Sequence, residues 1–294
     1  MKSIKILVLF AIAMILGSCN TSNGSISQSK KEAKMTLTNK EKAIAIYKAF
    51  ETGDSKVLDY ISDQQYKQHN LAFPEGKEAI KGFFSDKPTG IKVKIHRIFE
   101  DNDLVFLHST LGGVWNNGQP QVAMDVFRFE NGLVVEHWDN ITNETPPNPS
   151  GRTLVDGDTK IADKDQTTAN KALAKGLIAD VLMDGKGEMF PVYVNPNKYL
   201  QHNPQIADGL EAVGAVVKYF MENGIVMEYS QIHKVIGEGN FALVMSEGKF
   251  GENGGIPMAY YDLFRIEDGQ IVEHWDIMEP IPAKADWKNP NGKF

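Results

Sequence analysis

The chain has 294 residues, a formal net charge of −7 and a single cysteine, Cys19. This length fits about two domains of ordinary size. An acidic chain without basic clusters argues against nucleic acid as a partner, and one cysteine excludes an intrachain disulfide and a cysteine-based metal site.

The chain begins with a pattern typical of bacterial export. Lys2 and Lys5 precede an uncharged apolar run over residues 6–16, which is shorter than the roughly 20 residues of a membrane-spanning helix and matches a signal-peptide core. The run ends in LGSC at residues 16–19, which resembles the bacterial lipobox. By that resemblance, cleavage falls before Cys19 and lipid is attached to its sulfur. The alternative is an ordinary signal peptide that happens to contain a cysteine.

Lipidation also explains a lone cysteine in an exported chain. We therefore expect a lipid-anchored protein of the bacterial cell envelope, facing the periplasm or the cell surface. No second long apolar stretch follows in the sequence, so the lipid on Cys19 is the only membrane anchor we expect. Loss of Lys2 and Lys5 with the signal peptide takes the formal charge from −7 to about −9.

A domain-length repeat dominates the rest of the sequence. Residues 125–139 read DVFRFENGLVVEHWD and residues 262–276 read DLFRIEDGQIVEHWD, so ten of fifteen positions are identical at an offset of 137. Upstream, YKQHN at residues 66–70 matches YLQHN at residues 199–203. Two copies of one domain follow from this, each large enough for its own core.

The composition between the repeats predicts the domain boundaries. A stretch rich in Ser, Asn and Lys precedes the first copy and is typical of a flexible tether, and prolines, glycines and acidic residues separate the copies as in a linker. The expected organisation is signal peptide 1–18, tether 19–36, first domain 37–150, linker 151–165 and second domain 166–294. A shorter match, NPSGR at 148–152 against NPNGK at 289–293, follows each copy.

The order of elements within one copy predicts an α+β fold. Thr38 and Glu41 form a capping-box pattern ahead of an amphipathic helix. The further elements that we expect are a strand at 66–70, a helix at 76–84 and strands at 91–99, 104–111, 122–130 and 133–141. Helices followed by an antiparallel meander are typical of the α+β class.

Asn131-Gly132 predicts a two-residue hairpin turn, and this turn sets the faces of its two strands. Counting back from the turn pairs Phe127 with Glu136 and Asp125 with Trp138. Strand alternation then places these four side chains on one face, together with Phe129 and Val134. The opposite face, expected to lie outside the pocket, holds Arg128, Val135, His137 and Asp139. In the second copy, the corresponding prediction separates Asp262 from His274.

The string Asp-x-Phe-Arg-Phe-x-x-Gly, following Tyr-x-Gln-His-Asn and two helices, is similar to the SnoaL-like polyketide-cyclase family of the nuclear-transport-factor-like superfamily. It looks closest to members described as aldol-condensation-catalysing enzymes. The resemblance implies two cone-shaped domains, each a strongly bent antiparallel sheet around helices with a pocket at its open end. Such domains commonly dimerise through the sheet, which implies an internal pseudo-dimer and a monomeric protein.

Carried over by motif, the acid–base or oxyanion role of the family falls on Asp125 and Asp262. An aspartate among aromatic side chains has a raised pKa and can donate a hydrogen bond at neutral pH; the alternative is a structural ion pair with a nearby arginine. The ketosteroid isomerases of this superfamily carry their general base before a proline. Here Asn70 and Asn203 stand at that place, and an amide cannot accept a proton.

The neighbouring His69 and His202 are the candidate bases, since imidazole titrates in the right range. Tyr47 lies near the isomerase tyrosine, and the second copy has no tyrosine there. His108 follows Phe106 by two residues on one strand, and its counterpart in the second copy is a methionine, which favours the first copy as the catalytic one. The expected pocket residues are Tyr47, Asn70, His108, Phe127, Trp138, Asn203, Phe264 and Trp275.

Three functions fit these features. The first is acid–base catalysis of an aldol, cyclase or isomerase type on a small apolar carbonyl compound. The second is non-catalytic binding of a hydrophobic ligand, and the third is an interaction module with vestigial pockets. No dinucleotide fingerprint, P-loop or metal-ligand motif occurs, and a His with an Asp gives at most two ligands, so we expect no metal or cofactor.

Overall fold

The computed structural model describes residues 37–294, so the expected signal peptide, the Cys19 lipidation site and the tether lie outside the described residues. Thr145–Asp163 connects two halves of the same architecture. The elements of the first half are α1 (Asn39–Thr52), η1 (Ser55–Tyr60), β1 (Lys67–Gln68), α2 (Glu78–Lys81), β2 (Ile91–Asp101), β3 (Leu104–Gly113), η2 (Trp115–Gly118), β4 (Gln121–Glu130) and β5 (Leu133–Asn143).

The second half repeats this order with additional helical segments. Its elements are η3 (Lys164–Gln166), α3 (Thr167–Gly176), η4 (Leu177–Met183), η5 (Gly187–Met189), α4 (Phe190–Tyr193), β6 (Leu200–Gln201), α5 (Leu210–Glu222), β7 (Val226–Glu238), β8 (Phe241–Gly251), β9 (Ile256–Glu267), β10 (Gln270–Pro280) and η6 (Lys284–Asp286). Within residues 37–294, no helix has both the length and the apolar composition needed to cross a bilayer.

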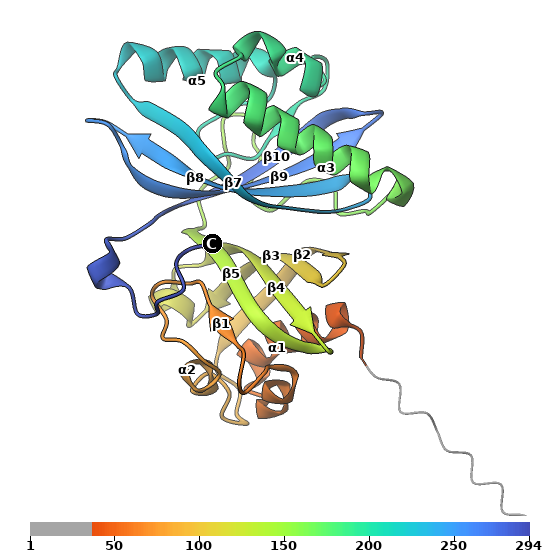
Figure 1. Cartoon of the computed structure of the whole chain (residues 1–294), viewed down its shortest axis with the longest axis vertical. Coiled ribbons are helices and arrows are strands. Elements are labelled where there is room, and N and C mark those ends of the chain that lie inside the picture. Colours follow the sequence, from red (N-terminus) through yellow and green to blue (C-terminus); the bar gives the residue numbers. More distant parts are fainter. Residues whose placement is uncertain (1–36) are drawn as a thin grey trace, which may run out of the picture. The chain divides into compact units, whose positions relative to one another are not determined.

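Each half contains one five-stranded sheet, in the order β1-β5-β4-β3-β2 and β6-β10-β9-β8-β7. The four long strands form an antiparallel meander, as the sequence predicted, and the short strand β1 or β6 pairs parallel to the last strand. The sheets are therefore mixed. Figure 1 shows the helices of each half on the side of its sheet that faces away from the other half.

Local sequence explains the first helix. The Thr38 side chain accepts a hydrogen bond from the Glu41 amide while the Glu41 carboxylate accepts one from the Thr38 amide, so the predicted capping box is confirmed. Gly53 closes the helix in the left-handed region at φ 74°. The helix expected over 76–84 is only one turn long, α2, whereas the second copy places the 13-residue helix α5 before the corresponding strand.

The hairpin turn forms as predicted, but the pairing beyond it does not. Asn131 and Gly132 both have positive φ, at 51° and 77°, which is the conformation of a two-residue hairpin turn. A bulge then follows: Phe129 pairs with Val134, while Arg128 pairs with Glu136, and Val135 has no partner in the ladder. The bulge allows Val134 and Val135, which are adjacent in the chain, both to be buried.

This bulge overturns the predicted faces, because a slip of one residue turns every later side chain to the opposite side of the sheet. Asp125 now lies opposite Asp139, and Phe127 opposite His137. The second copy has the same bulge between Ile271 and Glu273. The histidines and aspartates of the EHWD segments therefore share a face with Asp125 or Asp262, and the tryptophans do not.

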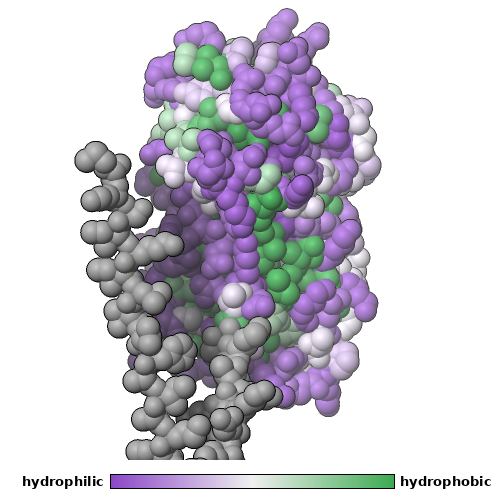
Figure 2. All heavy atoms as spheres, turned by 90° about the vertical axis from the view of Figure 1, so that its right-hand side faces the viewer, coloured by the Kyte–Doolittle hydropathy of each residue, from purple (hydrophilic) through white to green (hydrophobic). Residues whose placement is uncertain are grey.

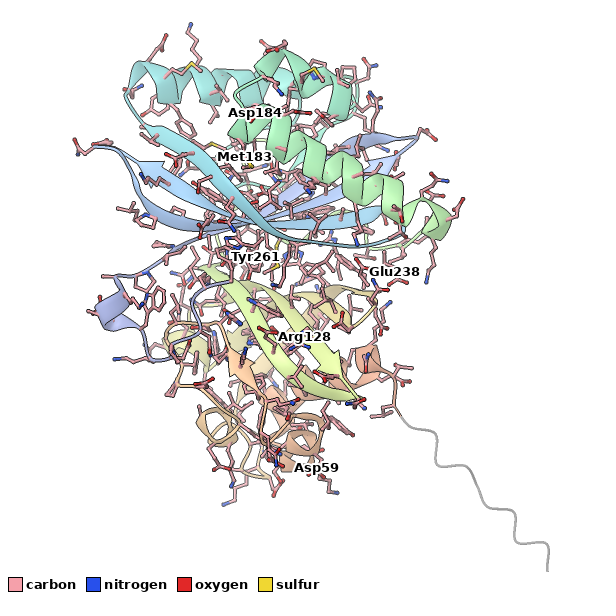
Figure 3. The ribbon with its side chains drawn as sticks, in the orientation of Figure 1. Asp59, Arg128, Met183, Asp184, Glu238 and Tyr261 are labelled. Carbon is pink, nitrogen blue, oxygen red and sulfur yellow. The ribbon has the colours of Figure 1, made fainter. Side chains whose placement is uncertain are left out.

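The two sheets pack against each other, with Tyr261 between them (Figure 3). The shared core combines aromatic and aliphatic side chains of both sheets, among them Phe99, Phe106, Trp138, Phe241, Leu243 and Trp275. Asn140 Nδ2 crosses this interface and donates to the carbonyl oxygens of Ala259 and Ile277, at 2.9 Å each. The halves form one internal pseudo-dimer.

Candidate functional site

Asp125 lines a cavity in the first half and Asp262 lines a cavity at the equivalent place in the second half, and these two cavities differ in size by almost an order of magnitude. The first has a volume of about 70 Å³, which is room for a few water molecules. The second has a volume of about 630 Å³, within the range of sites for small organic molecules. The second half, not the first, therefore has the space for a ligand.

Aromatic side chains fill the first cavity. The ring of Phe50 packs against those of Phe83, Phe84 and Trp115, with centroids 5.4, 5.3 and 6.3 Å apart. In the second half, helix α5 contributes Val213, Ala215, Val216, Tyr219 and Phe220 to the cavity wall instead. None of the residues of α5 is fully buried, because the cavity lies beneath this helix.

Asp125 lies at the wall of the first cavity and is hydrogen-bonded to the side chains of His137 and Tyr47. Its Oδ1 is 2.9 Å from Nε2 of His137, and its Oδ2 accepts a hydrogen bond from the hydroxyl of Tyr47 on α1. The structure therefore brings Tyr47 to Asp125 and puts His137 beside them, a residue that we had placed on the outer face. Sequence reasoning missed His137 because the pairing register depends on the bulge.

The second cavity has the same constellation with its tyrosine supplied by a different element. Oδ1 of Asp262 is 3.0 Å from Nε2 of His274. The hydroxyl of Tyr229, on strand β7, lies 3.4 and 3.3 Å from the two carboxylate oxygens of Asp262. These contacts are long for O–H···O bonds, so the Tyr229 proton is only loosely held by Asp262. No sequence signal pointed to Tyr229, since the first copy has no tyrosine on the corresponding strand.

A second carboxylate stands beside each pair. Asn70 Nδ2 donates to Oδ2 of Asp139, and Asn203 Nδ2 donates to Oδ2 of Asp276, both at 2.8 Å. Oδ1 of each aspartate is buried without a hydrogen-bond partner among residues 37–294. The two asparagines thus orient a carboxylate in each cavity. Oδ1 of Asp139 lies 3.9 Å from the Lys293 ammonium, whereas Oδ1 of Asp276 has no such ion pair among the described residues.

Burial controls the ionisation of these groups. Burial raises the pKa of the Asp125 and Asp276 carboxyls, since the charged form loses its hydration. Burial, with the charge of Asp262 next, raises the pKa of Tyr229 well above its usual range, so this hydroxyl stays protonated. Burial lowers the pKa of His274, but its bond to Asp262 and the charge of Asp276 outweigh burial and raise the pKa overall.

Two glutamines complete the network, and the sequence analysis did not single them out. Nδ1 of His137 is 3.0 Å from Oε1 of Gln68, and Nδ1 of His274 is 3.1 Å from Nε2 of Gln201. The side-chain oxygen of each glutamine also accepts the main-chain N–H two residues on, from Asn70 or Asn203. Their signal was the Tyr-x-Gln-His-Asn repeat, which retains the glutamine in both copies.

His69 and His202 do not reach either cavity. His69 stacks on Trp138 with centroids 4.8 Å apart, and its Nε2 is 2.9 Å from Glu136. His202 stacks on Trp275 at 4.6 Å and lies 2.8 Å from Glu273. Asn203 lines the second cavity, and Asn70, although not part of the first cavity's lining, bonds the lining residue Asp139. The two histidines stack on the tryptophans of the packed sheets instead, so neither imidazole is placed to act as a base in a cavity.

Trp138, Trp275 and His108 also lie between the sheets and not at the cavities, contrary to prediction. Both tryptophans belong to the shared core of the two halves. His108 is fully buried, with Nδ1 3.2 Å from the Arg97 guanidinium. Burial, followed by the charge of Arg97, lowers the pKa of His108 well below its usual range. The His108–methionine difference is thus a difference in the interface and does not favour the first cavity.

Phe127 and Phe264 lie where they were expected, on the cavity walls. Phe127 stacks on His137 with centroids 4.6 Å apart, and Phe264 stacks on His274 at 4.8 Å. These rings shield one face of each imidazole from solvent.

The expectation of at most two metal ligands needs correction for the first cavity. Ligand atoms of Asp125, His137 and Asp139 lie within 4.8 Å of one another, so three side chains are close enough to hold a metal ion. Hydrogen bonding also explains this arrangement, because the two ring nitrogens of His137 lie within hydrogen-bond distance of Gln68 and Asp125. No step below depends on a metal.

Comparison with known proteins agrees with the duplicated fold. The SnoaL-like domain family matches residues 43–137 and again residues 179–274. Among curated proteins, no match is found.

Solved structures match one half of the chain at a time. TsrD from Streptomyces laurentii is 20% identical, with 34% of this chain and 84% of that chain covered and a TM-score of 0.29. A putative polyketide cyclase from Bacillus cereus is 21% identical, with 36% of this chain and 78% of that chain covered and a TM-score of 0.30. An LEH-like epoxide hydrolase from M. tuberculosis is 12% identical, with 39% of this chain and 85% of that chain covered and a TM-score of 0.33.

Proposed function

This chain belongs to the SnoaL-like domain family in both of its halves, and on that premise we propose that its second cavity catalyses proton transfer on a small apolar carbonyl compound. One observation carries the proposal: Asp276 lines a cavity of about 630 Å³ with a buried carboxylate oxygen that has no hydrogen-bond partner within the described chain. A carboxyl group with a raised pKa in an apolar site is suited to general acid–base work.

Asp276 acts as the base in this mechanism. Its carboxylate takes a proton from the carbon next to the substrate carbonyl, and the electron pair of the broken C–H bond moves to the carbonyl oxygen, which forms an enolate. Asn203 holds the other oxygen of Asp276 at 2.8 Å and so fixes the direction of the free one. The raised pKa of Asp276 brings its basicity closer to that needed at neutral pH.

The enolate oxygen is stabilised by hydrogen bonding to Tyr229. This hydroxyl remains protonated because its pKa is well above the usual range, and its long contacts to Asp262 leave it free to turn toward a substrate. Asp262, held by His274, lies 3.4 and 3.3 Å from the same hydroxyl and keeps it at the cavity wall. A preorganised donor of this kind is worth most in a water-excluded site.

The enolate then has two outcomes that conserve atoms. With a β,γ-unsaturated ketone the enolate is a dienolate, and Asp276 returns the proton to its far carbon, which is an isomerisation. Otherwise the nucleophilic carbon attacks a second carbonyl, and the alkoxide that forms takes the proton from Asp276, which is an aldol or cyclase step. The lining by Leu177, Phe190, Val216 and Phe250 favours an apolar substrate.

The test is deuterium exchange. The full chain, purified in detergent, is incubated in D₂O with a panel of small apolar ketones, and loss of the proton next to the carbonyl is followed by ¹H NMR. We expect Asp276→Asn to slow exchange by a factor on the order of 10²–10⁴, while the matched change in the other half, Asp139→Asn, leaves it unchanged. No exchange above buffer with any ketone, or equal rates in Asp276→Asn and wild type, would refute catalysis here.

Binding of a hydrophobic ligand without turnover is the second candidate. It is supported by α5, a helix that covers the cavity with apolar side chains yet exposes Tyr219 and Met221 by 56% and 77%. Apolar atoms break the otherwise mostly hydrophilic surface near the top of Figure 2, the end that carries the helices of the second half. Native mass spectrometry decides: an organic molecule that co-purifies unchanged, and is lost in the cavity-filling variant Val216→Trp, establishes a carrier.

We also propose that the protein acts at the bacterial envelope, anchored by lipid on Cys19, and that it is monomeric. The first part is supported by the basic and apolar N-terminal pattern and the LGSC string. The second is supported by the face-to-face packing of the two sheets, which occupies the surface that such domains use for dimerisation.

A further inference from the structure

Two segments cross between the halves. The first strap, residues 144–162, follows β5 and packs on the second half, and the second strap, residues 281–294, follows β10 and packs on the first half. Each strap carries one copy of the Asn-Pro-x-Gly string, at residues 148–151 and 289–292. Strand β10 of the second half thus leads directly into the second strap, which packs on the first half. Strand β5 of the first half leads into the first strap, which packs on the second half.

Asn148 is the main contact of the first strap. Its Nδ2 donates to the carbonyl oxygens of Gln201, Asn203 and Ile206, at 2.6, 3.3 and 2.8 Å. Its Oδ1 accepts from main-chain N–H groups of the strap itself, which folds the strap into a tight turn around it. Asn148 has an exposed fraction of 5%, so these bonds are protected from water.

The second strap repeats this contact in the other half. Asn289 Nδ2 donates to the carbonyl oxygens of Asn70 and Phe73, at 2.8 and 3.0 Å, and Asn291 Nδ2 donates to that of Gln68 at 3.0 Å. Lys293 Nζ donates to the carbonyl oxygen of Asp139 at 2.7 Å. Equivalent strap residues therefore hold equivalent segments in both halves.

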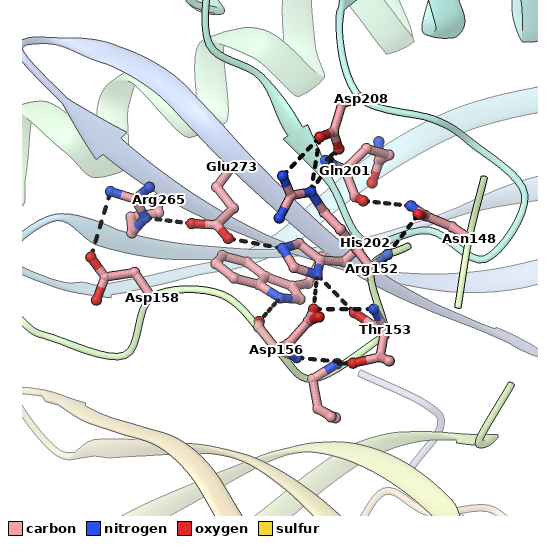
Figure 4. Close-up of polar contacts among 12 residues, drawn as sticks. Asn148, Arg152, Thr153, Asp156, Asp158, Gln201, His202, Asp208, Arg265 and Glu273 are labelled. Carbon is pink, nitrogen blue, oxygen red and sulfur yellow. Dashed lines mark hydrogen bonds and ion pairs between the residues drawn. The ribbon is translucent and has the colours of Figure 1, made fainter. Parts of the chain in front are cut away.

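The residues that each strap holds are those that touch the reactive groups. Gln201 and Asn203, whose carbonyl oxygens Asn148 binds, contact His274 and Asp276 through their side chains. A salt bridge adds to this contact (Figure 4). The Arg152 guanidinium binds both carboxylate oxygens of Asp208, and Oδ1 of that carboxylate accepts a hydrogen bond from the Gln201 main-chain N–H.

We propose that the two straps are reciprocal positioning elements, in which Asn148 fixes the Gln201–Asn203 segment of the second cavity and Asn289 fixes the Gln68–Asn70 segment of the first. Each half therefore completes the site of the other. This inference rests on the proposed function only in treating Asp276 as the reactive carboxyl; the positioning itself is measurable without any substrate.

The physical consequence is a shift in ionisation. When Asn148 no longer holds this segment, the Asn203 amide loses its fixed position, and the hydrogen bond that favours the ionised form of Asp276 weakens. A neutral Asp276 removes negative charge that raises the pKa of His274. The pKa of His274 should therefore fall.

The test measures the pKa values of His274 and His137 by long-range ¹H–¹⁵N NMR on the full chain in detergent, with His274→Gln and His137→Gln used for assignment. In Asn148→Ala we expect the pKa of His274 to fall by about half a unit or more while that of His137 stays constant. Asn289→Ala should give the mirror result, with a change at His137 and none at His274.

Asn148→Ser guards against a variant that fails to fold, because its hydroxyl oxygen can still accept main-chain N–H groups of the strap turn, while the Nδ2 donors are removed and no charge is added. It should lower the pKa of His274 as Asn148→Ala does. Unchanged histidines in folded Asn148→Ser and Asn289→Ala overturn the proposal. So do equal shifts of both histidines in each variant, which would indicate a general loosening of the protein. Neither result bears on whether the second cavity catalyses proton transfer.

Discussion

Nε2 of His274 lies 3.0 Å from Oδ1 of Asp262, and Phe264 on the neighbouring strand stacks on the imidazole. The pair lines the larger cavity, with Asp262 buried and His274 half-buried, and the hydroxyl of Tyr229 lies within 3.4 Å of the same carboxylate. The Asp262–His274 pair, the protonated hydroxyl of Tyr229 and the unpaired oxygen of Asp276 therefore surround one apolar cavity.

Removing the hydroxyl of Tyr229 should affect turnover more than binding. Tyr229→Phe keeps the ring that packs on Tyr260 at a centroid distance of 4.2 Å but removes the donor to the enolate oxygen. We expect a loss of about 10²–10³-fold in kcat, measured by the deuterium exchange of a responsive ketone. Tyr47→Phe is the matched change in the small cavity and should leave the rate as it is. Equal losses in both variants would contradict the assignment to the second cavity.

Stability should depend on pH through His274 with a defined sign. Its pKa is raised in the folded protein, so its contribution to stability is fully present below the unfolded pKa of about 6.5 and is lost as pH rises through the folded value. The difference in unfolding free energy between wild type and His274→Asn, from urea denaturation, should therefore shrink as pH increases above 6.5.

His96→Asn provides a control of opposite sign. Burial, followed by the charges of Lys94 and Arg97, lowers the pKa of His96 to about 4. A lowered histidine pKa contributes stability that is present above the unfolded pKa and is lost as pH falls toward 4. The wild-type advantage over His96→Asn should thus grow with pH between 4 and 7. If the wild-type advantage changed with pH in the same direction for both variants, neither pH dependence would come from the substituted histidine.

The two interface tryptophans should differ in their energetic importance. Trp275 donates from Nε1 to the carbonyl oxygen of Asp156 at 2.9 Å. Each ring has a cation over it, Arg97 at 4.0 Å from Trp275 and Lys234 at 4.2 Å from Trp138, so this contact does not separate the two. Nε1 of Trp138 is buried without a partner among the described residues. Both changes to alanine remove a large buried ring, at a cost of about 3–5 kcal/mol. Trp275→Ala should be the more destabilising by about 1 kcal/mol, the value of one hydrogen bond, in chemical denaturation; the reverse order would contradict this.

The chain should be monomeric when its lipid is absent. The sheet faces that would pair two chains are already buried against each other, with Trp138 and Trp275 exposed by 2% and 0%. Light scattering of the Cys19→Ser protein without detergent should give the mass of one chain at all concentrations tested. A dimer that persists on dilution would show that a further surface pairs the molecules.

Cys19→Ser should also release the protein from the membrane. If the LGSC string at residues 16–19 is a lipobox, radiolabelled palmitate is incorporated into wild type and not into the variant, and the variant moves to the soluble fraction. Incorporation into both, or into neither with equal membrane retention, would exclude Cys19 as the anchor site.

The sequence alone determined the duplication, the α+β order and the hairpin turns, because these depend on local signals. The capping box of Thr38 and Glu41 and the turn at Asn131-Gly132 involve residues a few positions apart, and both form as predicted. The repeated strings likewise need no folding to be visible.

The tertiary structure alone decided which side chains meet. The bulge at Val135 depends on burying two neighbouring valines at once, and it turns His137 toward Asp125 and Trp138 toward the other half. Tyr229 reaches Asp262 from a strand whose counterpart supplies no tyrosine, and the difference between cavities of about 70 and 630 Å³ follows from how rings and α5 pack. These outcomes depend on contacts between residues distant in the chain, which a pattern of spacing along the sequence does not contain.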